Sequence, residues 1–451
     1  MTDKPREAAL ELLRAVREDD AYANLVLPQL LHGYGLSGRD AAFATELAYG
    51  TLRGLGWYDA VLASCVTRPW QKVEPALQDV LRLGAHQVLA MRVPDHAAVD
   101  SSCELARALL PRSGADARAG FVNAVLRKVA KHDADGWAVQ LQAERADDDV
   151  EWLGTRWSHP TWIVRAMRDA LGTRRGELVD LLVADNTPAR PSLVARPGRL
   201  PVEDLLALPE VEPGRWSPLA ATLVDGTPDS LAFVRDGRVG VQDEGSQLVA
   251  LALARAQVDA DTGRWLDMCA GPGGKAALLD GLAREAGGHL VAVEQHAHRA
   301  DLVQQSLAAD SPSRVLTGDS RHAPWGDEQF DRVLLDAPCT GLGALRRRPE
   351  SRWRRTTADL AALGALQRDL LRSAIDATRS GGVIAYATCS PHLAETEFVI
   401  SDVLKGRTDV VLEDARALLP EVPDCGVGPT VQLWPHRHGT DAMFLAVLRK
   451  S

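Results

Sequence analysis

The chain has 451 residues, of which 46% are hydrophobic and 25% charged, and its formal net charge is −10. This length exceeds one ordinary hydrophobic core and predicts two or three domains of a soluble, globular protein. The N-terminus has no apolar signal segment, and no apolar run reaches the roughly 18 residues of a membrane helix, so we expect a cytoplasmic protein.

The first 140 residues have the pattern of a helical bundle. Apolar residues recur at helical spacing in segments separated by short polar or proline-containing joints. These segments are residues 8–16, 41–52, 76–91, 99–110 and 119–132. The sequence therefore predicts an all-α domain over 1–140.

A polar, acidic stretch from about 133 to 150 marks a boundary. Residues 150–240 contain two helix-like stretches and then a region rich in Pro and Gly. Two short apolar runs in that region, SLVA (192–195) and LAFV (231–234), are interpreted as β-like. We expect a small α/β connecting domain here.

From residue 241 to 451 strand-like and helix-like segments alternate. The strand-like segments begin at residues 264, 289, 314, 331 and 382, and amphipathic helices lie between them. This alternation predicts a Rossmann-like α/β domain with a mostly parallel sheet. A last apolar run over 442–450 is expected to add an antiparallel strand.

Polar or reactive residues stand where the predicted strands end, at Asp267, Glu294, Asp319, Asp336 and Cys389. In an open α/β sheet, ligands bind outside the carboxyl ends of the strands. Packing alone does not account for such a residue at every strand end. We therefore expect the functional site at this edge.

The first strand leads into the glycine-rich stretch DMCAGPGGK, residues 267–275. Gly271, Gly273 and Gly274 let the backbone approach a ligand, and a helix begins near Lys275. Glu294 follows Gly274 by twenty residues, the distance at which an acid usually binds ribose hydroxyls. The loop predicts a nucleoside-bearing cofactor, but by itself it does not separate NAD from S-adenosylmethionine.

Six cysteines stand at positions 65, 103, 269, 339, 389 and 425, and no two form a C-x-x-C pair. This spacing disfavours a zinc ribbon or a thioredoxin-like motif, and in a reducing cytosol we expect free thiols. Two H-x-H pairs, at 296–298 and 436–438, have no nearby pattern that completes a metal site. No metal is predicted.

Two of the cysteines are delivered to the expected ligand edge. Cys339 lies in DAPCTG after the fourth strand, and Cys389 lies in ATCSP after the fifth. A free cysteine is most often a small core residue. Two thiols beside a methyl donor, however, fit methylation at carbon 5 of a pyrimidine, in which a thiolate adds at carbon 6 and a base later removes the carbon-5 proton.

A local basic segment runs against the overall negative charge. RRRPESRWRR, residues 346–355, contains six arginines and one tryptophan against a single Glu350. A basic run with an aromatic residue suits phosphate contact and base stacking, and a solvated charged turn is the alternative. We expect RNA contact from Arg346, Arg347, Arg348, Arg352, Trp353, Arg354 and Arg355.

Together these motifs resemble the bacterial RNA cytosine-C5 methyltransferases of the NOL1/NOP2/Sun group. The resemblance rests on DMCAGPGGK, on DAPCTG followed by arginines, and on ATCSPHLAETE, and it covers about residues 150–451. The stretches LAYGTLRG (47–54) and FVNAVLRK (121–128) resemble the antitermination factor NusB. This fusion is typical of the 16S rRNA cytosine-C5 methyltransferase B subfamily, which implies small-subunit ribosomal RNA as the substrate and a NusB-like RNA-binding domain at 1–140.

The resemblance also implies roles for individual residues. Cys389 would be the nucleophile, Cys339 would serve product release as or near the base, and Asp336 would contact the cofactor or the exocyclic edge of the cytosine. S-adenosylmethionine would be held by the first motif, with Glu294 on the ribose and Asp319 near the adenine. The residues of that motif are Asp267, Cys269, Ala270, Gly271, Pro272, Gly273, Gly274 and Lys275.

The chain departs from the family pattern at two positions: many relatives have Asp at the position of Glu294 and Ala at the position of Gly271. Both changes are expected to be harmless. Three alternatives to a monomeric rRNA methyltransferase remain. These are an enzyme for tRNA or another RNA, a DNA cytosine-C5 methyltransferase with Cys339 as its nucleophile, and a non-catalytic antitermination factor.

Overall fold

The structure is a computed structural model that describes residues 3–109, 114–142 and 146–451. The chain divides into two compact units, which are described separately. The first contains Met1–Thr187 together with Leu345–Arg354, and the second contains Pro188–Ala344 and Arg355–Ser451. The predicted segment 150–240 is thus divided at Thr187, because its helices pack with the N-terminal ones.

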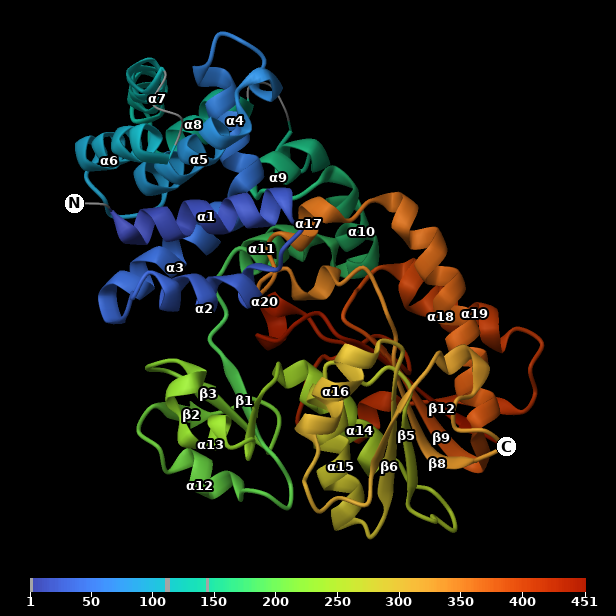
Figure 1. Cartoon of the computed structure of the whole chain (residues 1–451). Coiled ribbons are helices and arrows are strands. Elements are labelled where there is room, and N and C mark those ends of the chain that lie inside the picture. The colour runs from blue at the N-terminus through green and yellow to red at the C-terminus, as the bar shows by residue number, and fades with distance from the viewer. Residues whose placement is uncertain (1–2, 110–113, 143–145) are drawn as a thin grey trace. The chain divides into compact units, whose positions relative to one another are not determined.

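The first unit is helical, as the 3.6-residue periodicity predicts. Its core is built from the apolar faces of these helices, with Leu12, Leu47, Leu81 and Leu126 all buried. The predicted end of one helix at Leu110 lies outside the described residues. The helices are α1 (Lys4–Glu18), α2 (Ala23–Gly33), α3 (Gly38–Arg53), α4 (Leu55–Cys65), α5 (Pro75–Leu89), α6 (Asp95–Leu109), α7 (Ala115–Val129), α8 (Ala134–Gln142), α9 (Val150–Arg156), α10 (Thr161–Leu171), α11 (Leu178–Asp185) and the short α17 (Ser351–Arg354) (Figure 1).

The second unit opens with a four-stranded antiparallel sheet of order β2-β3-β1-β4. Its strands are β1 (Ser192–Ala195), β2 (Val211–Pro213), β3 (Ala220–Leu223) and β4 (Val239–Val241), accompanied by α12 (Val202–Leu206) and α13 (Ala232–Arg235). The prediction of a strand over 231–234 is wrong, because Ala232–Arg235 is a helical turn. Leu231 is buried in the core of this small sheet, and a four-residue apolar run does not distinguish a helical turn from a strand.

The large sheet has the order β10-β12-β9-β8-β5-β6-β7, with β11 paired to β12. Strands β5 to β9 are mutually parallel and β12 runs antiparallel to β9, so the predicted parallel sheet with an antiparallel last strand is confirmed. The strands are β5 (Arg264–Asp267), β6 (His289–Glu294), β7 (Arg314–Thr317), β8 (Phe330–Asp336), β9 (Thr378–Thr388), β10 (Val410–Glu413), β11 (Val431–Gln432) and β12 (Phe444–Lys450).

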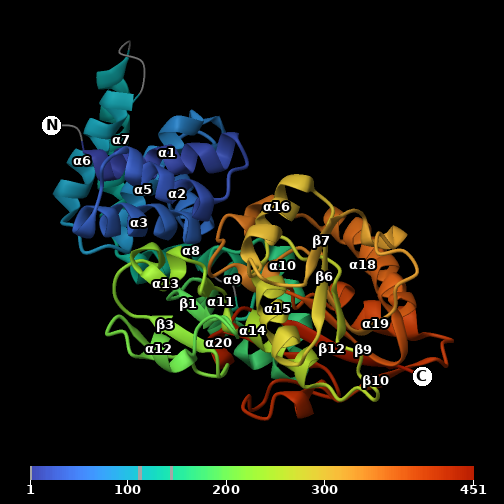
Figure 2. The ribbon, with the colours of Figure 1, turned by 60° about the horizontal axis from the view of Figure 1, so that its bottom comes forward.

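Helices cover both faces of this sheet (Figures 1 and 2). Alternate residues of one strand enter different cores: Trp265 packs with α14 (Glu244–Arg255), α15 (Gly274–Glu285) and α16 (Ala297–Ser306), whereas Leu266 packs with α18 (Thr357–Ala377) and α19 (Glu397–Leu404). The strand order reverses between β5 and β8. Such a switch point is where ligands bind in doubly wound sheets.

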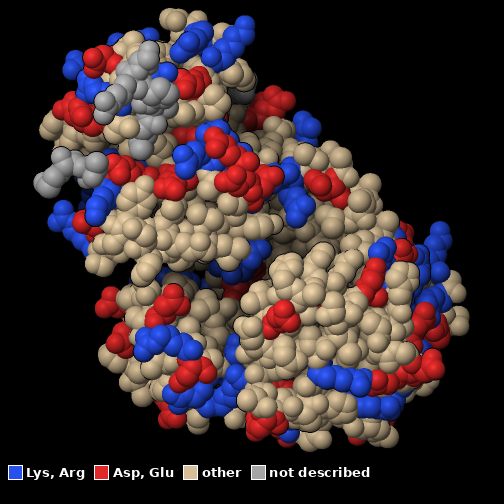
Figure 3. Space-filling model, in the orientation of Figure 1, with Lys and Arg blue, Asp and Glu red and all other residues tan. Residues whose placement is uncertain are grey.

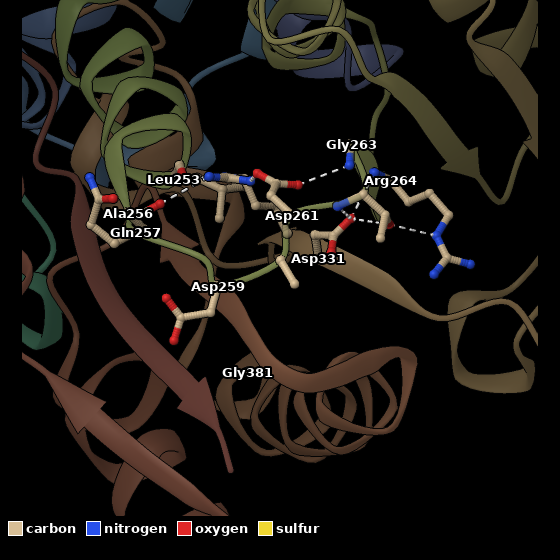
Figure 4. Close-up of polar contacts among 12 residues, drawn as sticks. Leu253, Ala256, Gln257, Asp259, Asp261, Gly263, Arg264, Asp331 and Gly381 are labelled. Carbon is tan, nitrogen blue, oxygen red and sulfur yellow. Dashed lines mark hydrogen bonds and ion pairs between the residues drawn. The ribbon is translucent and has the colours of Figure 1, made fainter.

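A polar network joins the starts of the parallel strands, at the end of the sheet opposite to their carboxyl ends (Figure 4). Asp331 is fully buried and accepts hydrogen bonds from the backbone N–H groups of Thr262 (3.1 Å) and Arg264 (2.9 Å). Arg379 also donates to Asp331, which holds the start of β9 beside the start of β8. Bonds of this kind lower the pKa of Asp331 against the opposing effect of burial.

Candidate active site

The carboxyl ends of the parallel strands bring the predicted residues to one edge. Asp267 ends β5, Glu294 ends β6 and Asp336 ends β8, while Cys389 directly follows β9. Asp319 comes two residues after the end of β7. In the registers, Asp267 pairs beside Leu334 of β8, and Asp336 beside Ala387 of β9, so neighbouring strands end close together.

The two motif cysteines lie next to each other. The Sγ atoms of Cys339 and Cys389 are 3.5 Å apart, and both side chains are partly exposed. The hydrogen bond between the two thiols lowers the pKa of Cys389, although burial and the carboxylate of Asp336 oppose this effect. The same pairing, followed by burial, raises the pKa of Cys339 well above its usual value. The two shifts run in opposite directions, so the environment favours ionisation of Cys389 over that of Cys339.

A cation stands beside this pair. Lys275 Nζ lies 2.8 Å from Asp336 Oδ2, and the lysine side chain is 12% exposed. Burial by itself lowers the pKa of Lys275, but the carboxylate of Asp336 outweighs burial and the pKa is raised. The ammonium group also lowers the pKa of Cys389. From the sequence, Lys275 or an arginine of the 346–355 segment could lower the pKa of Cys389, but their positions could not be predicted. In the structure Lys275 is one of the groups that lower it.

Asp267 is almost completely buried at the end of β5. Its Oδ1 accepts a hydrogen bond from the backbone N–H of Cys269 (3.2 Å), whereas its buried Oδ2 has no hydrogen-bond partner in the described part of the chain. Burial, together with the charge of Asp336, raises the pKa of Asp267 to about 7. A buried carboxyl oxygen without a protein partner is a point at which a ligand or a water molecule can bind.

Backbone hydrogen bonds fix the glycine-rich loop. The N–H of Ala270 donates to the carbonyl of Val293 (2.9 Å), and that of Gly273 donates to the carbonyl of Ala270 (2.8 Å). Gly273 has φ +115°, a conformation that favours glycine, and it directly precedes α15. The loop therefore ends at the N-terminus of a twelve-residue helix, which carries a partial positive charge.

The two acids that follow β6 and β7 differ in environment. Glu294 is buried, accepts from the backbone N–H of His296 (3.0 Å) and lies 3.5 Å from Arg299. Asp319 is more exposed and is bound by Arg321, which lowers the pKa of Asp319. Arg321 also lines a cavity of about 620 Å³ that neither motif cysteine lines. The ribose and adenine roles of these two acids stay predictions.

The residues present fit S-adenosylmethionine, the predicted cofactor. Asp267 offers an unsatisfied buried oxygen, the glycine loop offers backbone at a helix N-terminus, and Glu294 offers a buried carboxylate at the next strand end. Asp267, the loop from Cys269 to Lys275 and Glu294 would hold the cofactor. No group of three or more His, Cys, Asp or Glu with metal-site geometry occurs in residues 3–109, 114–142 and 146–451.

Residues 346–354 of the arginine segment belong to the first unit, where Arg352 is completely buried, and Arg355 belongs to the second. Its guanidinium donates to the carbonyl of Ser158 (2.9 Å) and to Asn186 Oδ1 (2.8 Å). Burial lowers the pKa of Arg352 to about 10. Arg354 donates to the carbonyl of Ala21.

Arg352 therefore has a structural role in the described fold. The sequence predicted RNA contact for it, because a run of arginines does not show which of them is buried. Trp353, by contrast, is 40% exposed, and the guanidinium of Arg348 stacks 5.6 Å from the ring centre of Tyr22. RNA contact stays a prediction for the segment, most directly for its exposed members Arg347, Arg348 and Trp353.

Sequence reasoning missed one residue of the site, Glu395. It lies in the quoted motif ATCSPHLAETE but received no role. The structure places its carboxylate, fully buried, against Thr340 and Ser390, the residues that follow the two cysteines. The one signal in the sequence was its position, six residues after the reactive Cys389 and within the quoted motif.

Two known families match parts of this chain. Residues 252–449 match the family described as 16S rRNA methyltransferase RsmB/F, and residues 3–131 match the NusB family. The chain is 53% identical over 449 residues to a Mycobacterium tuberculosis protein provisionally named a methyltransferase, covering 99% of this chain and 97% of the relative. It is 32% identical over 461 residues to the probable ribosomal RNA small subunit methyltransferase B of Bacillus subtilis, covering 99% and 98%.

Solved structures share the fold. The crystal structure of PH0851 superposes with a TM-score of 0.78 at 23% identity, covering 100% of this chain and 99% of that one. The structure of NSun6 from Pyrococcus horikoshii with SFG gives a TM-score of 0.54 at 18% identity, covering 64% of this chain and 98% of that one. In the described residues, no helix combines the length and the apolar character needed to cross a membrane.

Proposed function

Because the chain belongs to the 16S rRNA methyltransferase RsmB/F family of S-adenosylmethionine-dependent enzymes, we propose that it forms 5-methylcytidine in small-subunit ribosomal RNA. In this proposal the reaction passes through a covalent adduct on Cys389. The observation that carries the proposal is the pair of thiols 3.5 Å apart at the ligand edge of the sheet. A transferase that attacked a nitrogen or an oxygen would need neither thiol.

In the proposed reaction, the Cys389 thiolate adds to carbon 6 of the cytosine, and the ring becomes nucleophilic at carbon 5. S-adenosylmethionine supplies the methyl group that carbon 5 takes. Lys275 and the Cys339 thiol stabilise the Cys389 thiolate before attack. A thiol with an ordinary pKa of about 8.5 is only a few per cent ionised at neutral pH, so this stabilisation raises the reactive fraction.

Release of the product requires removal of the carbon-5 proton, after which the bond to Cys389 breaks and the thiolate leaves. We propose that Cys339 acts as or near the base: its thiol, protonated at rest, first gives its proton to solvent and then takes the carbon-5 proton, while the electrons of the broken C–H bond re-form the C5=C6 double bond and expel Cys389 as a thiolate. Asp336, held by Lys275, is proposed to contact the cofactor or the exocyclic edge of the cytosine. A cytosine within a helix must be extruded to reach these groups.

The RNA-binding surface must be local, because the net charge of −10 disfavours nucleic acid as a whole. On the face shown in Figure 3, basic and acidic side chains are interspersed. We propose that the exposed part of the 346–355 segment and the NusB-like helices contribute the contacts. Moderate salt is therefore expected to weaken binding.

The test uses purified protein, labelled S-adenosylmethionine and unmodified small-subunit rRNA. We expect Cys389→Ala to give neither methyl transfer nor a protein–RNA adduct that survives denaturation, and Cys339→Ala to accumulate the adduct. The reverse result would support the mechanism of the DNA cytosine-C5 enzymes, with Cys339 as the nucleophile. Parallel reactions with tRNA test the other RNA substrate, and wild-type protein without transfer or cofactor binding would point to a non-catalytic factor.

A further inference from the structure

A buried carboxylate joins the two cysteine loops. Glu395 is 0% exposed and lies between Thr340, which follows Cys339, and Ser390, which follows Cys389. Its Oε1 accepts from the backbone N–H of Thr340 (2.7 Å). Its Oε2 accepts from the Thr340 hydroxyl (2.5 Å) and from the Ser390 hydroxyl (2.6 Å).

Further hydrogen bonds fix the position of this carboxylate. Gln367 Nε2 donates to Glu395 Oε1 (3.3 Å) and also to the carbonyl of Pro338 (2.8 Å), the residue before Cys339. The Tyr386 hydroxyl donates to the carbonyl of Glu395 itself (2.7 Å). Glu395 is thus held at its backbone and at both carboxylate oxygens.

An ionised carboxylate is the side-chain group that matches these donors, because it accepts at two oxygens and donates nothing. Burying a carboxylate is costly unless its oxygens are hydrogen-bonded, and here both oxygens are. Helix α18 and the loops after β8 and β9 each supply at least one donor. Simple packing of the turn after Cys389 does not require such an arrangement, since an apolar side chain would fill the same space without desolvating a charge.

We propose that Glu395 is a positioning residue that sets the separation of the Cys339 and Cys389 thiols by bridging the backbone segments that carry them. This inference rests on the proposed function, in which Cys389 attacks and Cys339 serves release. Both steps depend on where the two sulfurs lie relative to one cytosine ring. A displacement of about 1 Å at a reacting group is enough to cost roughly a hundredfold in rate.

The charge of Glu395 has a second effect on this pair. The hydrogen bond to Cys389 is the largest cause of the raised pKa of Cys339, followed by burial and by the charges of Cys389, Glu395 and Asp336. Tyr386 also faces Cys339. A negative charge disfavours a second negative charge nearby. Glu395 therefore helps to keep Cys339 protonated, which leaves the thiolate on Cys389.

The first measurement needs neither RNA nor cofactor. Initial rates of alkylation of Cys339 and Cys389 by iodoacetamide are followed against pH by peptide mass spectrometry in the full-length protein. Glu395→Gln is expected to lower the pH midpoint for Cys339, because it removes a charge and keeps the shape. Glu397→Gln is the matched control, since Glu397 is exposed two residues away, and it is expected to leave both midpoints unchanged.

The second measurement is single-turnover methyl transfer to unmodified small-subunit rRNA. Glu395→Gln is expected to slow transfer roughly a hundredfold while the dissociation constant for S-adenosylmethionine changes less than about threefold. Thr340→Val removes one hydroxyl donor and keeps the charge, so it should slow transfer about tenfold without moving the Cys339 midpoint. If Glu395→Gln does not fold, Thr340→Val decides the positioning role alone.

Transfer by folded Glu395→Gln at close to the wild-type rate, or a wild-type Cys339 midpoint in that variant, overturns the inference. If Glu395→Gln does not fold, methyl transfer by Thr340→Val at the wild-type rate also overturns the inference. Failure of wild-type protein to methylate any RNA instead refutes the proposed function. The alkylation profiles then still decide whether Glu395 controls the thiol pair.

Discussion

The carboxylate of Glu294 occupies the space that a β-carbon at residue 271 would need, so Gly271 and Glu294 depend on each other. These are the two positions at which the chain departs from the family pattern. Taken singly in the sequence, each change is expected to be harmless. In the structure, the longer carboxylate is accommodated because residue 271 has no side chain.

We expect Gly271→Ala to weaken S-adenosylmethionine binding roughly tenfold, because the methyl group would push the buried carboxylate of Glu294 from its position. Shortening the acid makes room, so the double variant Gly271→Ala/Glu294→Asp should bind closer to wild type than Gly271→Ala does. Calorimetric titrations of the four proteins form a double-mutant cycle. Strictly additive effects would contradict the coupling.

Lys275 is expected to control the ionisation of Cys389. Lys275→Met removes a positive charge that favours the thiolate, so the pKa of Cys389 should rise and its alkylation midpoint should move to higher pH. Lys275→Arg keeps the charge and should shift the midpoint less. Lys72→Met, which removes an exposed lysine of the other unit, is the control. An unchanged Cys389 midpoint in Lys275→Met would assign its activation to Cys339 alone.

Asp267 makes stability depend on pH. Its pKa is about 7 in the folded protein and about 3.9 in an unfolded chain. The folded state therefore holds a proton that the unfolded state has lost, and this contribution is fully present below about pH 4 and disappears as the pH rises through about 7. Asp267→Asn does not titrate, so its stability relative to wild type should increase between pH 5 and pH 8.

Urea unfolding at the two pH values, without cofactor, measures this difference. The expected change is on the order of 2 kcal/mol, since each pKa unit corresponds to about 1.4 kcal/mol. Asp310→Asn, an exposed carboxylate paired with Arg284, is the control. A stability difference that is the same at both pH values would mean that Asp267 is ionised throughout.

Arg352 is expected to stabilise the helical unit. Arg352→Met leaves the carbonyl of Ser158 and the amide oxygen of Asn186 without their buried donor. Each buried acceptor left without a donor costs about 1–3 kcal/mol. Two of them cost about 2–6 kcal/mol, which lowers Tm by roughly 4–24 °C for a unit of this size. Differential scanning calorimetry measures the shift.

Arg347→Met is the matched control, because Arg347 lies in the same segment but is exposed. Arg347→Met should leave Tm within about 1 °C of the wild-type value. If Arg347 contacts an RNA phosphate, the variant should also reduce the slope of log binding constant against log salt concentration by about 1. Equal Tm values for Arg352→Met and wild type would show that the buried contacts are dispensable.

Much of this protein could be predicted from local patterns. The helical periodicity up to residue 132, the alternation after residue 241 and the residues at the strand ends identified the fold class and placed Asp267, Asp336 and Cys389 at one edge. The run LAFV was misjudged because four apolar residues carry too little periodicity to separate a strand from a helical turn. The arginine run was only partly interpretable, since composition does not say which guanidinium is buried.

The chemical groups at the ends of the strands follow from the sequence alone, because strand and helix periods are local and parallel strands end at one edge. Which of those groups meet depends on how the chain packs in three dimensions. Lys275 reaches Asp336 across 61 positions of the chain, and Cys339 reaches Cys389 across 50. Packing sets such distances to within about an ångström, and both the ionisation of a thiol and the bridge made by Glu395 depend on distances of that order.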